Sequence, residues 1–369
     1  RTAGNFVNQR NTDSPALSKP GHKYHHNLGR FSPLIRSSQR TLSHKLNCGG
    51  ANHRFLLFKT GKEAKTVNDT VHGHMVQDLL RHRFGSHECL ICKYSPKYPV
   101  QAEREFQRVT NAYIRILNEL LKESLPEIRD AARAEKEGQR YDDASDLIAK
   151  VKTVFSKMTV ELERRTSMFG LRSKIESMAK LTRKLSIREW KKAVKSTLGI
   201  DLMDDYYTGE LYRTMMERWV EDNVALIKTI PQESLGRMRQ IVLEGYRNGE
   251  TTTAIVKQIQ RAYSVDRRHA QLLARDQIAK LNGDITQQQQ QDAGVVEYVW
   301  STSGDSRVRP SHAALNHKRF RWDDPPVVDE KTGRRCHPGK DYQCRCCALP
   351  VFNIKTVDLP VTKGGDGRG

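Results

Sequence analysis

The sequence predicts an α+β protein that is mostly α-helical, with an extended helical N-terminal region and a small C-terminal α+β module. Between residues 100 and 294, apolar residues recur at spacings of three and four, which is the period of an amphipathic helix. After Gly294 the period changes to two, which is typical of strands. Pro and Gly then become frequent, which indicates short elements joined by turns.

The charge of the chain is strongly positive. Its 63 Lys and Arg against 43 Asp and Glu give +20, and residues 1–100 alone contribute +11, from 16 Lys and Arg against 5 Asp and Glu. Two interpretations remain open: a solvated basic surface, or contact with nucleic acid through counterion release. No apolar run approaches the roughly 18–20 residues of a transmembrane helix, so we expect no membrane partner.

Composition divides the chain into four parts. Residues 1–93 have poor hydrophobic periodicity and are rich in Gly, Ser, Asn, His and Arg, so we expect a basic, disordered extension outside the functional domain. Two prolines within four residues then predict an extended linker, which opens a helical region over residues 94–229. A C-terminal module follows over residues 230–352, and residues 353–369 are expected to be a flexible tail.

Helical periodicity begins directly after the linker. Five apolar stripes mark predicted helices, at Phe106–Leu121, Leu147–Leu162, Trp190–Leu198, Leu211–Ile227 and Leu235–Val242. Two further helices are expected over residues 252–263 and 266–293, and Gly294 closes the second of them.

Local signals place several helix ends. Ser186-Ile187-Arg188-Glu189 has the pattern of a capping box, which predicts a helix start ahead of Trp190. Pro231 suits the first turn of a helix, and Asn248-Gly249 predicts a stop. The five consecutive glutamines from Gln287 to Gln291 are interpreted as a polar helix face without a specific role.

Three strands are predicted after Gly294. The first is marked by the alternation of Val296, Tyr298 and Trp300, and the others cover Lys318–Trp322 and Cys344–Val351. Residues 323–339 contain many turn-forming residues and are expected to be a loop. A core of this size often needs a staple, a metal or a partner.

Four side chains of this module have the chemistry of a zinc site. Cys344 and Cys346 are two apart, so on a strand they face the same side. His312 and His337 lie on breaker-rich segments that can fold back over that strand, and two histidines with two thiolates form a tetrahedral zinc site. The alternative is that the thiols pack beside a hydrogen-bonded histidine without a metal.

The other cysteines carry weaker signals. Cys336 and Cys347 lie next to the candidate ligands and make any single assignment less specific. Cys89 and Cys92 have the Cys-x-x-Cys spacing, but no second pair follows nearby, so we interpret them as a chance pairing in an irregular segment.

Charged residues gather at a predicted turn. Asp305 is placed to cap backbone N–H groups there, and Arg307 and Arg309 share a face if the chain is extended. Arg345, between two cysteines, points to the opposite face from them and can join Asp305. We favour an Asp–Arg network that holds the turn; the alternative is binding of phosphate or of an acidic partner by the arginines.

A catalytic interpretation has less support. His312, Asn316, His317 and His337 loosely suggest a metal-dependent nuclease. However, no spacing fixes a general base, no carboxylate pair is evident, and neither a phosphate-binding Gly-rich loop nor a serine-nucleophile elbow occurs. We therefore do not expect an enzyme, and keep the nuclease as the alternative.

A combination of motifs resembles the phage Mu F-like head-morphogenesis domain. These motifs are Ala274-Arg275-Asp276-Gln277, the run from Asp305 to His312, the run from Phe320 to Pro326, His337-Pro338-Gly339, and Cys344-Arg345-Cys346. The resemblance is dense over residues 230–352 and places Trp322 and Asp323 in the same structural or interaction motif as the arginines. The family usually has a glycine where Asn316-His317 stand here, and asparagine tolerates a left-handed turn.

The resemblance implies a minor head protein of a tailed bacteriophage or prophage. Such a protein is a component of the virion head and is present in the host cytoplasm during assembly. Its implied partners are the portal protein and capsid proteins, with DNA as a further candidate. The implied role is in head assembly and in DNA packaging or delivery.

Overall fold

The computed structural model describes residues 67–85, 87–137, 144–203 and 210–359, all of which belong to one unit, residues 55–369. Its helices are α2 (Val67–Phe84), α3 (Val100–Glu137), α4 (Ala144–Ser167), α5 (Leu171–Leu198), α6 (Glu210–Arg247), α7 (Thr252–Asp292) and α8 (Pro310–Ala313). Its strands are β1 (Cys89–Ile91), β2 (Glu297–Ser301), β3 (Arg319–Arg321), β4 (Val327–Asp329), β5 (Arg334–Arg335) and β6 (Cys347–Asn353). The mostly helical α+β class is therefore confirmed.

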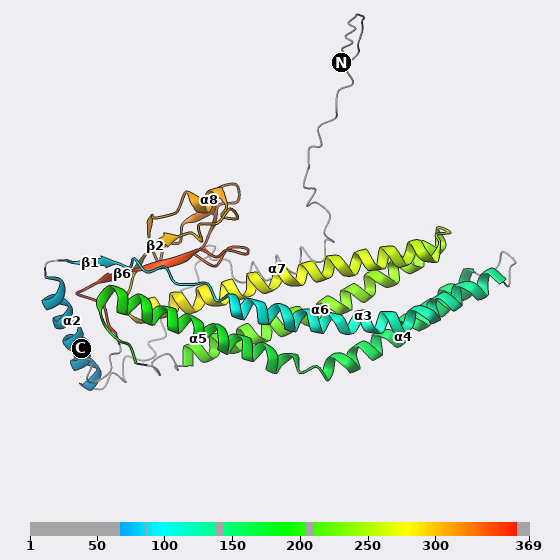
Figure 1. Cartoon of the computed structure of the whole chain (residues 1–369), viewed down its shortest axis with the longest axis horizontal. Helices are drawn as coiled ribbons and strands as arrows, with labels where there is room; N and C mark the ends of the chain where they lie inside the picture. Colours follow the sequence, from blue (N-terminus) through cyan, green and yellow to red (C-terminus); the bar gives the residue numbers. More distant parts are fainter. Residues whose placement is uncertain (1–66, 86, 138–143, 204–209, 360–369) are drawn as a thin grey trace, which may run out of the picture. The chain divides into compact units, whose positions relative to one another are not determined.

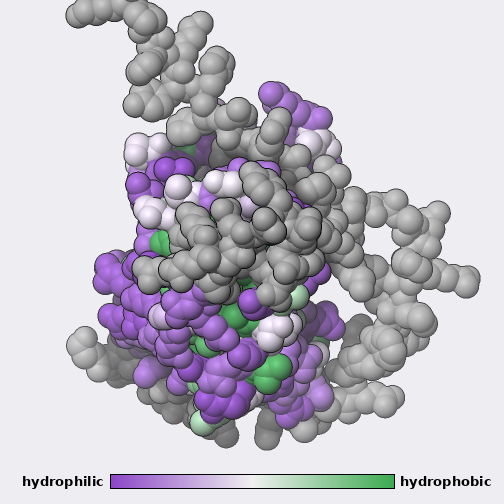
Figure 2. Space-filling view, turned by 90° about the vertical axis from the view of Figure 1, so that its right-hand side faces the viewer, coloured by the Kyte–Doolittle hydropathy of each residue, from purple (hydrophilic) through white to green (hydrophobic). Residues whose placement is uncertain are grey.

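The long helices α3 to α7 pack side by side, and the sheet lies against α5 and α7 (Figure 1). The sheet is antiparallel in the order β1-β6-β2-β3, while β4 and β5 form a separate hairpin. None of the described helices combines the length and the apolar character needed to cross a membrane. The face formed at the far ends of α3, α4, α6 and α7 is largely hydrophilic, with a few hydrophobic side chains near its middle (Figure 2).

The stop signals at glycine work as predicted. Gly249 after α6 and Gly294 after α7 both adopt left-handed backbone angles, with φ of 68° and 72°. Gly294 is also required by space, because a Cβ there would meet the backbone oxygen of Thr356 at 2.5 Å. The chain after β6 therefore passes directly over the end of α7.

Three predicted helix breaks are wrong. Helix α5 runs through the supposed capping box, where Ser186 is buried and Glu189 instead accepts hydrogen bonds from the Tyr94 hydroxyl at 2.5 Å and from the Lys97 N–H at 3.0 Å. Helix α6 continues through Pro231, and α7 is a single helix from 252 to 292. Packing against neighbouring helices outweighs these weak local signals, because burial of a long apolar face stabilises a continuous helix.

The predicted boundaries also shift. Val76, Leu80 and Cys92, assigned above to the extension, are core residues, and β1 pairs with β6. The boundary at 229/230 falls inside α6, and the predicted tail starts too early because Ile354 to Leu359 still contribute buried side chains. Residues 1–66 and 360–369 lie outside the described residues, so the disorder expected there stays a prediction.

Three clusters of buried apolar side chains form the core. Two of them join the long helices, and the larger of these also takes in β6 and the residues after it. The third fills the small module and consists of Tyr298, Trp300, Trp322, Val328, Cys344, Cys346 and Ala348. This third cluster contains both cysteines of the candidate metal site.

Candidate metal centre

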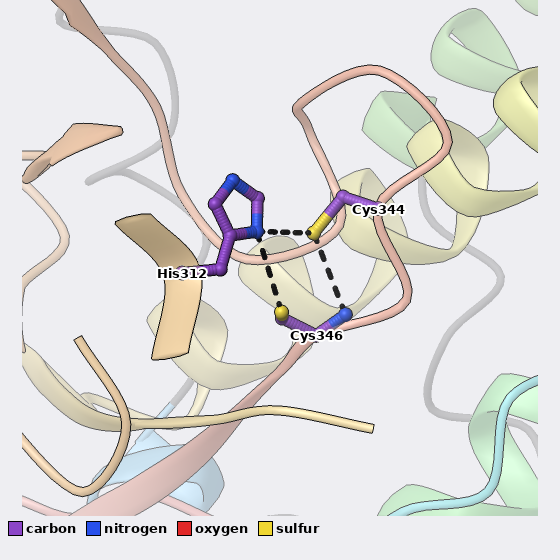
Figure 3. A group of neighbouring side chains, drawn as sticks. All are labelled: His312, Cys344 and Cys346. Atoms are coloured by element: carbon purple, nitrogen blue, oxygen red, sulfur yellow. Dashed lines mark hydrogen bonds between the residues drawn. The ribbon is translucent and has the colours of Figure 1, made fainter. Parts of the chain in front are cut away.

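His312, Cys344 and Cys346 meet in the interior of the small module (Figure 3). His312 comes from α8, whose first residue is Pro310, and its side chain is 2 % exposed. Its Nδ1 lies 3.5 Å from Sγ of Cys344 and 3.6 Å from Sγ of Cys346, so one nitrogen faces both sulfurs. Three of the four residues predicted as metal ligands therefore lie together.

The sequence analysis placed the two cysteines on a strand, and this was wrong: they lie in the turn that leads into β6. Gln343 before them adopts a left-handed φ of 50°, and its N–H is held at 2.8 Å by the carboxylate of Asp276 on α7. The N–H of Cys346 points at Sγ of Cys344, at 3.4 Å. The turn, rather than strand alternation, places both thiols on one side.

His337 does not join this group, so the predicted set of two histidines and two cysteines is not assembled. Its Nδ1 lies 2.9 Å from the hydroxyl of Tyr298, and its ring packs 4.8 Å from the ring of Trp322. Burial lowers the pKa of His337 to about 4. A half-buried, neutral histidine in an aromatic cluster is a structural residue here.

Asp341 is the residue that sequence reasoning missed. Its carboxylate oxygen Oδ2 lies 2.9 Å from Nε2 of His312, and the side chain is 1 % exposed. A carboxylate on the far nitrogen of a metal-ligating histidine fixes both the ring and its tautomer. The motif containing His337 and Gly339 carried the signal, because Asp341 follows it after one residue.

Arginines on both sides neutralise Asp341. Arg309 donates to Oδ2 at 3.2 Å, and the backbone N–H of Tyr342 donates to Oδ1 at 2.8 Å. Arg334 forms an ion pair with Oδ1 at 3.0 Å. Burial opposes the charged form of the carboxylate, but the hydrogen bonds from His312 and Tyr342 and these two guanidinium groups lower its pKa. Arg309 thus acts on His312 indirectly, because both side chains bind the same oxygen of Asp341.

The electrostatics of the three gathered side chains favour a charged pair. Burial alone would lower the pKa of His312, but hydrogen bonds with Asp341 and Cys344 raise it to about 9. The neighbouring Cys346 thiol, and then His312, lower the pKa of Cys344 to about 5, and this thiolate raises the pKa of Cys346. In the absence of a metal, these shifts favour a thiolate on Cys344 beside a protonated His312, and a cation bound at Nδ1 would replace that proton.

The Asp–Arg network expected at the turn is present in the structure. Asp305 accepts the backbone N–H of Arg307 at 3.1 Å and its guanidinium at 3.0 Å. Arg345, from between the two cysteines, also contacts the Asp305 carboxylate. The network therefore joins the turn before α8 to the cysteine turn.

Trp322 and Asp323 occupy different environments. Asp323 is exposed and pairs with Arg321 at 2.8 Å, whereas Trp322 is 6 % exposed and donates its indole N–H to Gln290 at 3.3 Å. Gln290 in turn donates to the backbone oxygen of Ala348 at 2.8 Å. The interpretation of the glutamines as a polar face was wrong, because Gln289 and Gln290 are each 1 % exposed under the sheet.

The residues of the nuclease alternative have different local roles. The side chain of Asn316 accepts the N–H of Thr302 at 3.0 Å, which holds the loop before α8. His317 carries the left-handed turn, with φ 62°, so the tolerant asparagine is not the residue that adopts it. His312 and His337 have different partners, as described above.

The arrangement can hold a metal ion through two sulfurs and one nitrogen. The turn after His337 also packs closely on α7. A Cβ added to Gly339 would lie 3.4 Å from Cα of Gly283. Asp276, Gln290 and Gly283 thus tie α7 to the cysteine turn, the sheet and the turn after His337. The site is part of a buried framework rather than an open cleft.

Comparison with known proteins finds a family match for this module. Residues 237–349 match the family of phage Mu protein F like proteins. A protein of Haemophilus influenzae (strain ATCC 51907 / DSM 11121 / KW20 / Rd), described as an uncharacterized protein, is 31 % identical over 160 residues, which is 43 % of this chain and 34 % of that protein. The match thus spans about a third of the length of that relative. No solved structure matches the chain.

Proposed function

Because residues 237–349 carry the phage Mu protein F like module, as the sequence motifs indicated, we propose that this chain is a minor head protein of a tailed bacteriophage or prophage. The family match is the observation that carries the proposal. The protein would act near the portal and the capsid interior, in head assembly and in DNA packaging or delivery. It would be found in the virion head and, during assembly, in the host cytoplasm.

The way the motif residues are used supports a structural role. Asp276 holds the cysteine turn, Trp322 packs in the module core, and Asp305 joins two turns. These residues therefore stabilise a small module on the end of α7. A rigid module on long packed helices suits an assembly component, with the helices α3 to α6 as the part that docks on the portal or the capsid.

Contact with DNA is the less specific part of the proposal. Residues 101–369 carry 47 Lys and Arg against 38 Asp and Glu, a moderate excess. Electrostatic binding to the phosphate backbone weakens steeply with salt. Binding of duplex DNA by residues 101–369 alone, with strong salt dependence, would support direct contact; affinity confined to residues 1–100 would count against it.

The main experiment is deletion of the gene in the phage or prophage that encodes the chain. We expect a fall in the yield of DNA-filled, infectious particles, and recovery when the intact gene is supplied in trans. Mass spectrometry of purified heads should find the chain in a few copies per particle. An unchanged particle yield together with absence of the chain from purified heads would refute the proposal.

Complementation with a His312→Ala variant separates this role from the nuclease alternative. In an assembly protein, the variant should lower the stability of the module or block head formation, and the intact protein should show no nuclease activity to lose. In a nuclease, the variant should keep its fold and stop cleaving DNA or RNA. The cleavage assay on intact protein, with Mg²⁺, Mn²⁺ or Zn²⁺ added, decides between the two.

A further inference from the structure

The distances from Nδ1 of His312 to the sulfurs of Cys344 and Cys346 match those of a tetrahedral metal site. Zinc binds thiolate sulfur at about 2.3 Å and imidazole nitrogen at about 2.0 Å, which places nitrogen and sulfur about 3.5 Å apart when the ligands are tetrahedral. The two measured separations from Nδ1 are 3.5 and 3.6 Å. All three ligand atoms also lie within 4.8 Å of one another.

The orientation of the histidine favours a metal over a simple hydrogen bond. With its Nε2–H donated to Asp341, a neutral ring presents its Nδ1 lone pair to both sulfurs at once. Nδ1, whether it accepts from a thiol or donates to a thiolate, can form a good hydrogen bond with only one sulfur, whereas a cation between the three atoms satisfies all of them. The carboxylate beyond the ring is the usual outer partner of a metal-ligating histidine.

The charge of the site points the same way. Two thiolates and a divalent cation sum to zero in a region where the three side chains are 2 %, 4 % and 8 % exposed. The carboxylate of Asp341 is already balanced by Arg309 and Arg334. A buried neutral cluster avoids the desolvation cost that isolated buried charges carry.

A neighbouring buried donor faces one of the sulfurs. The indole N–H of Trp300 interacts with the Cys346 sulfur, and the Trp300 ring packs edge-on against the ring of His312 at 5.4 Å. A hydrogen bond from a buried donor stabilises the charged form of a thiolate. The surroundings of Cys346 therefore suit the thiolate that a metal site needs.

We propose that His312 Nδ1 and the thiolates of Cys344 and Cys346 bind one zinc-type divalent cation, with a fourth position left for a water molecule or another outside ligand. Two sulfurs and an imidazole select a borderline-soft ion such as Zn²⁺ over Mg²⁺ or Ca²⁺, which prefer oxygen. The ion would link α8 to the turn before β6, and so staple the small core of the module. Its test is metal content, which is measured independently of any role in head assembly.

The experiment measures metal in the purified full-length chain by inductively coupled plasma mass spectrometry. We expect about one zinc per chain after extensive dialysis, by the stoichiometry of a single three-ligand site. Cys344→Ser and Cys346→Ser should each lose most of this zinc. The matched controls are Cys347→Ser, a neighbouring thiol outside the cluster, and His337→Gln, a half-buried histidine outside it; both should keep the zinc.

Replacement of zinc by Co²⁺ in the wild-type chain gives a readout that does not depend on the variants folding. Cobalt in this site should show thiolate-to-cobalt charge-transfer absorption and the intense visible bands of tetrahedral coordination. Removal of the metal with a chelator should lower the melting temperature, and zinc should restore it. Absence of bound metal and of cobalt–thiolate absorption, or equal zinc loss in the two controls, would overturn the proposal.

Discussion

The carboxylate of Asp341 lies 2.9 Å from Nε2 of His312, and 29 residues separate the two in the sequence. The same buried carboxylate accepts hydrogen bonds from Arg309 and from the backbone of Tyr342. This one carboxylate therefore holds three parts of the module together: the ring of His312, the segment before α8 and the turn after Gly339.

Asp341→Asn should destabilise the module because the amide removes the negative charge that balances His312, Arg309 and Arg334. Loss of one partner from a buried charged network costs about 3–5 kcal/mol, and the partial exposure of the arginines reduces this to about 2–3 kcal/mol. Chemical denaturation of the variant and the wild type measures the difference. Asp323→Asn, in an exposed pair with Arg321, is the control and should change stability far less. Equal effects of the two substitutions would refute the assigned role of Asp341.

Gln290→Ala should be much more harmful than Gln291→Ala, although the two glutamines are adjacent. Gln290 accepts from the Trp322 indole and donates to the Ala348 carbonyl, so alanine leaves two buried polar groups unpaired. Each unpaired buried group costs about 1–3 kcal/mol, so the expected loss is about 2–4 kcal/mol. Gln291 is exposed, and its replacement should leave the thermal unfolding midpoint almost unchanged. Similar midpoints for both variants would contradict the bridging role of Gln290.

Gly339→Ala tests the close approach between α7 and the turn after His337. The residue has a φ of 80°, and a Cβ would lie 3.3 Å from the backbone oxygen of Ala279 and 3.4 Å from Cα of Gly283. We expect a loss of about 2–4 kcal/mol, from backbone strain together with overpacking. Gly333→Ala isolates the backbone part, because its φ is 65° with open space around the position, and it should cost about 1 kcal/mol. Denaturation of both variants measures the difference, and a Gly339 effect no larger than the Gly333 effect would show that packing is not the constraint.

The lowered pKa of His337 predicts that the protein loses stability in mild acid. Burial places its folded-state pKa at about 4, below the unfolded value of about 6.5, so the unfolded chain takes up the proton first as the pH falls. The stability that this residue contributes is complete above about pH 6.5 and declines toward pH 4, by up to about 3 kcal/mol in total. The free energy of unfolding, measured from pH 7.5 to 4.5, should therefore fall more steeply for the wild type than for His337→Gln. Parallel pH profiles would mean that His337 is not held neutral by the fold.

The helical periodicity and the helix ends at glycine were predicted correctly from the sequence. The stripe from Phe106 to Leu121 lies in α3, and Gly249 and Gly294 end their helices in the left-handed conformation. These signals succeeded because they act within a few residues: a periodic apolar face buries itself, and only glycine adopts that backbone angle at little cost. The capping box at Ser186 failed because Glu189 found better partners in Tyr94 and Lys97, about 90 residues away in the chain.

The candidate site shows the same division. Cys344 and Cys346 stood out by spacing and His312 by its motif, and all three meet. His337 looked equivalent to His312 in sequence but packs with Tyr298 and Trp322 instead. Asp341 was missed although it follows the motif ending at Gly339 after one residue, because nothing in the sequence pairs this aspartate with His312.

By itself, the sequence determined the helical and strand periods, the left-handed glycine stops and the motif set over residues 230–352 that resembles the phage Mu F-like domain, a resemblance supported by the family match over residues 237–349. Only the tertiary structure decided which histidine faces the thiols, which carboxylate supports it, and that Gln290 is a buried bridge rather than surface. The physical reason is the distance along the chain over which each interaction acts. Periodicity and backbone preference are local properties of the chain, whereas burial and pairing depend on which distant segments the packed helices bring together.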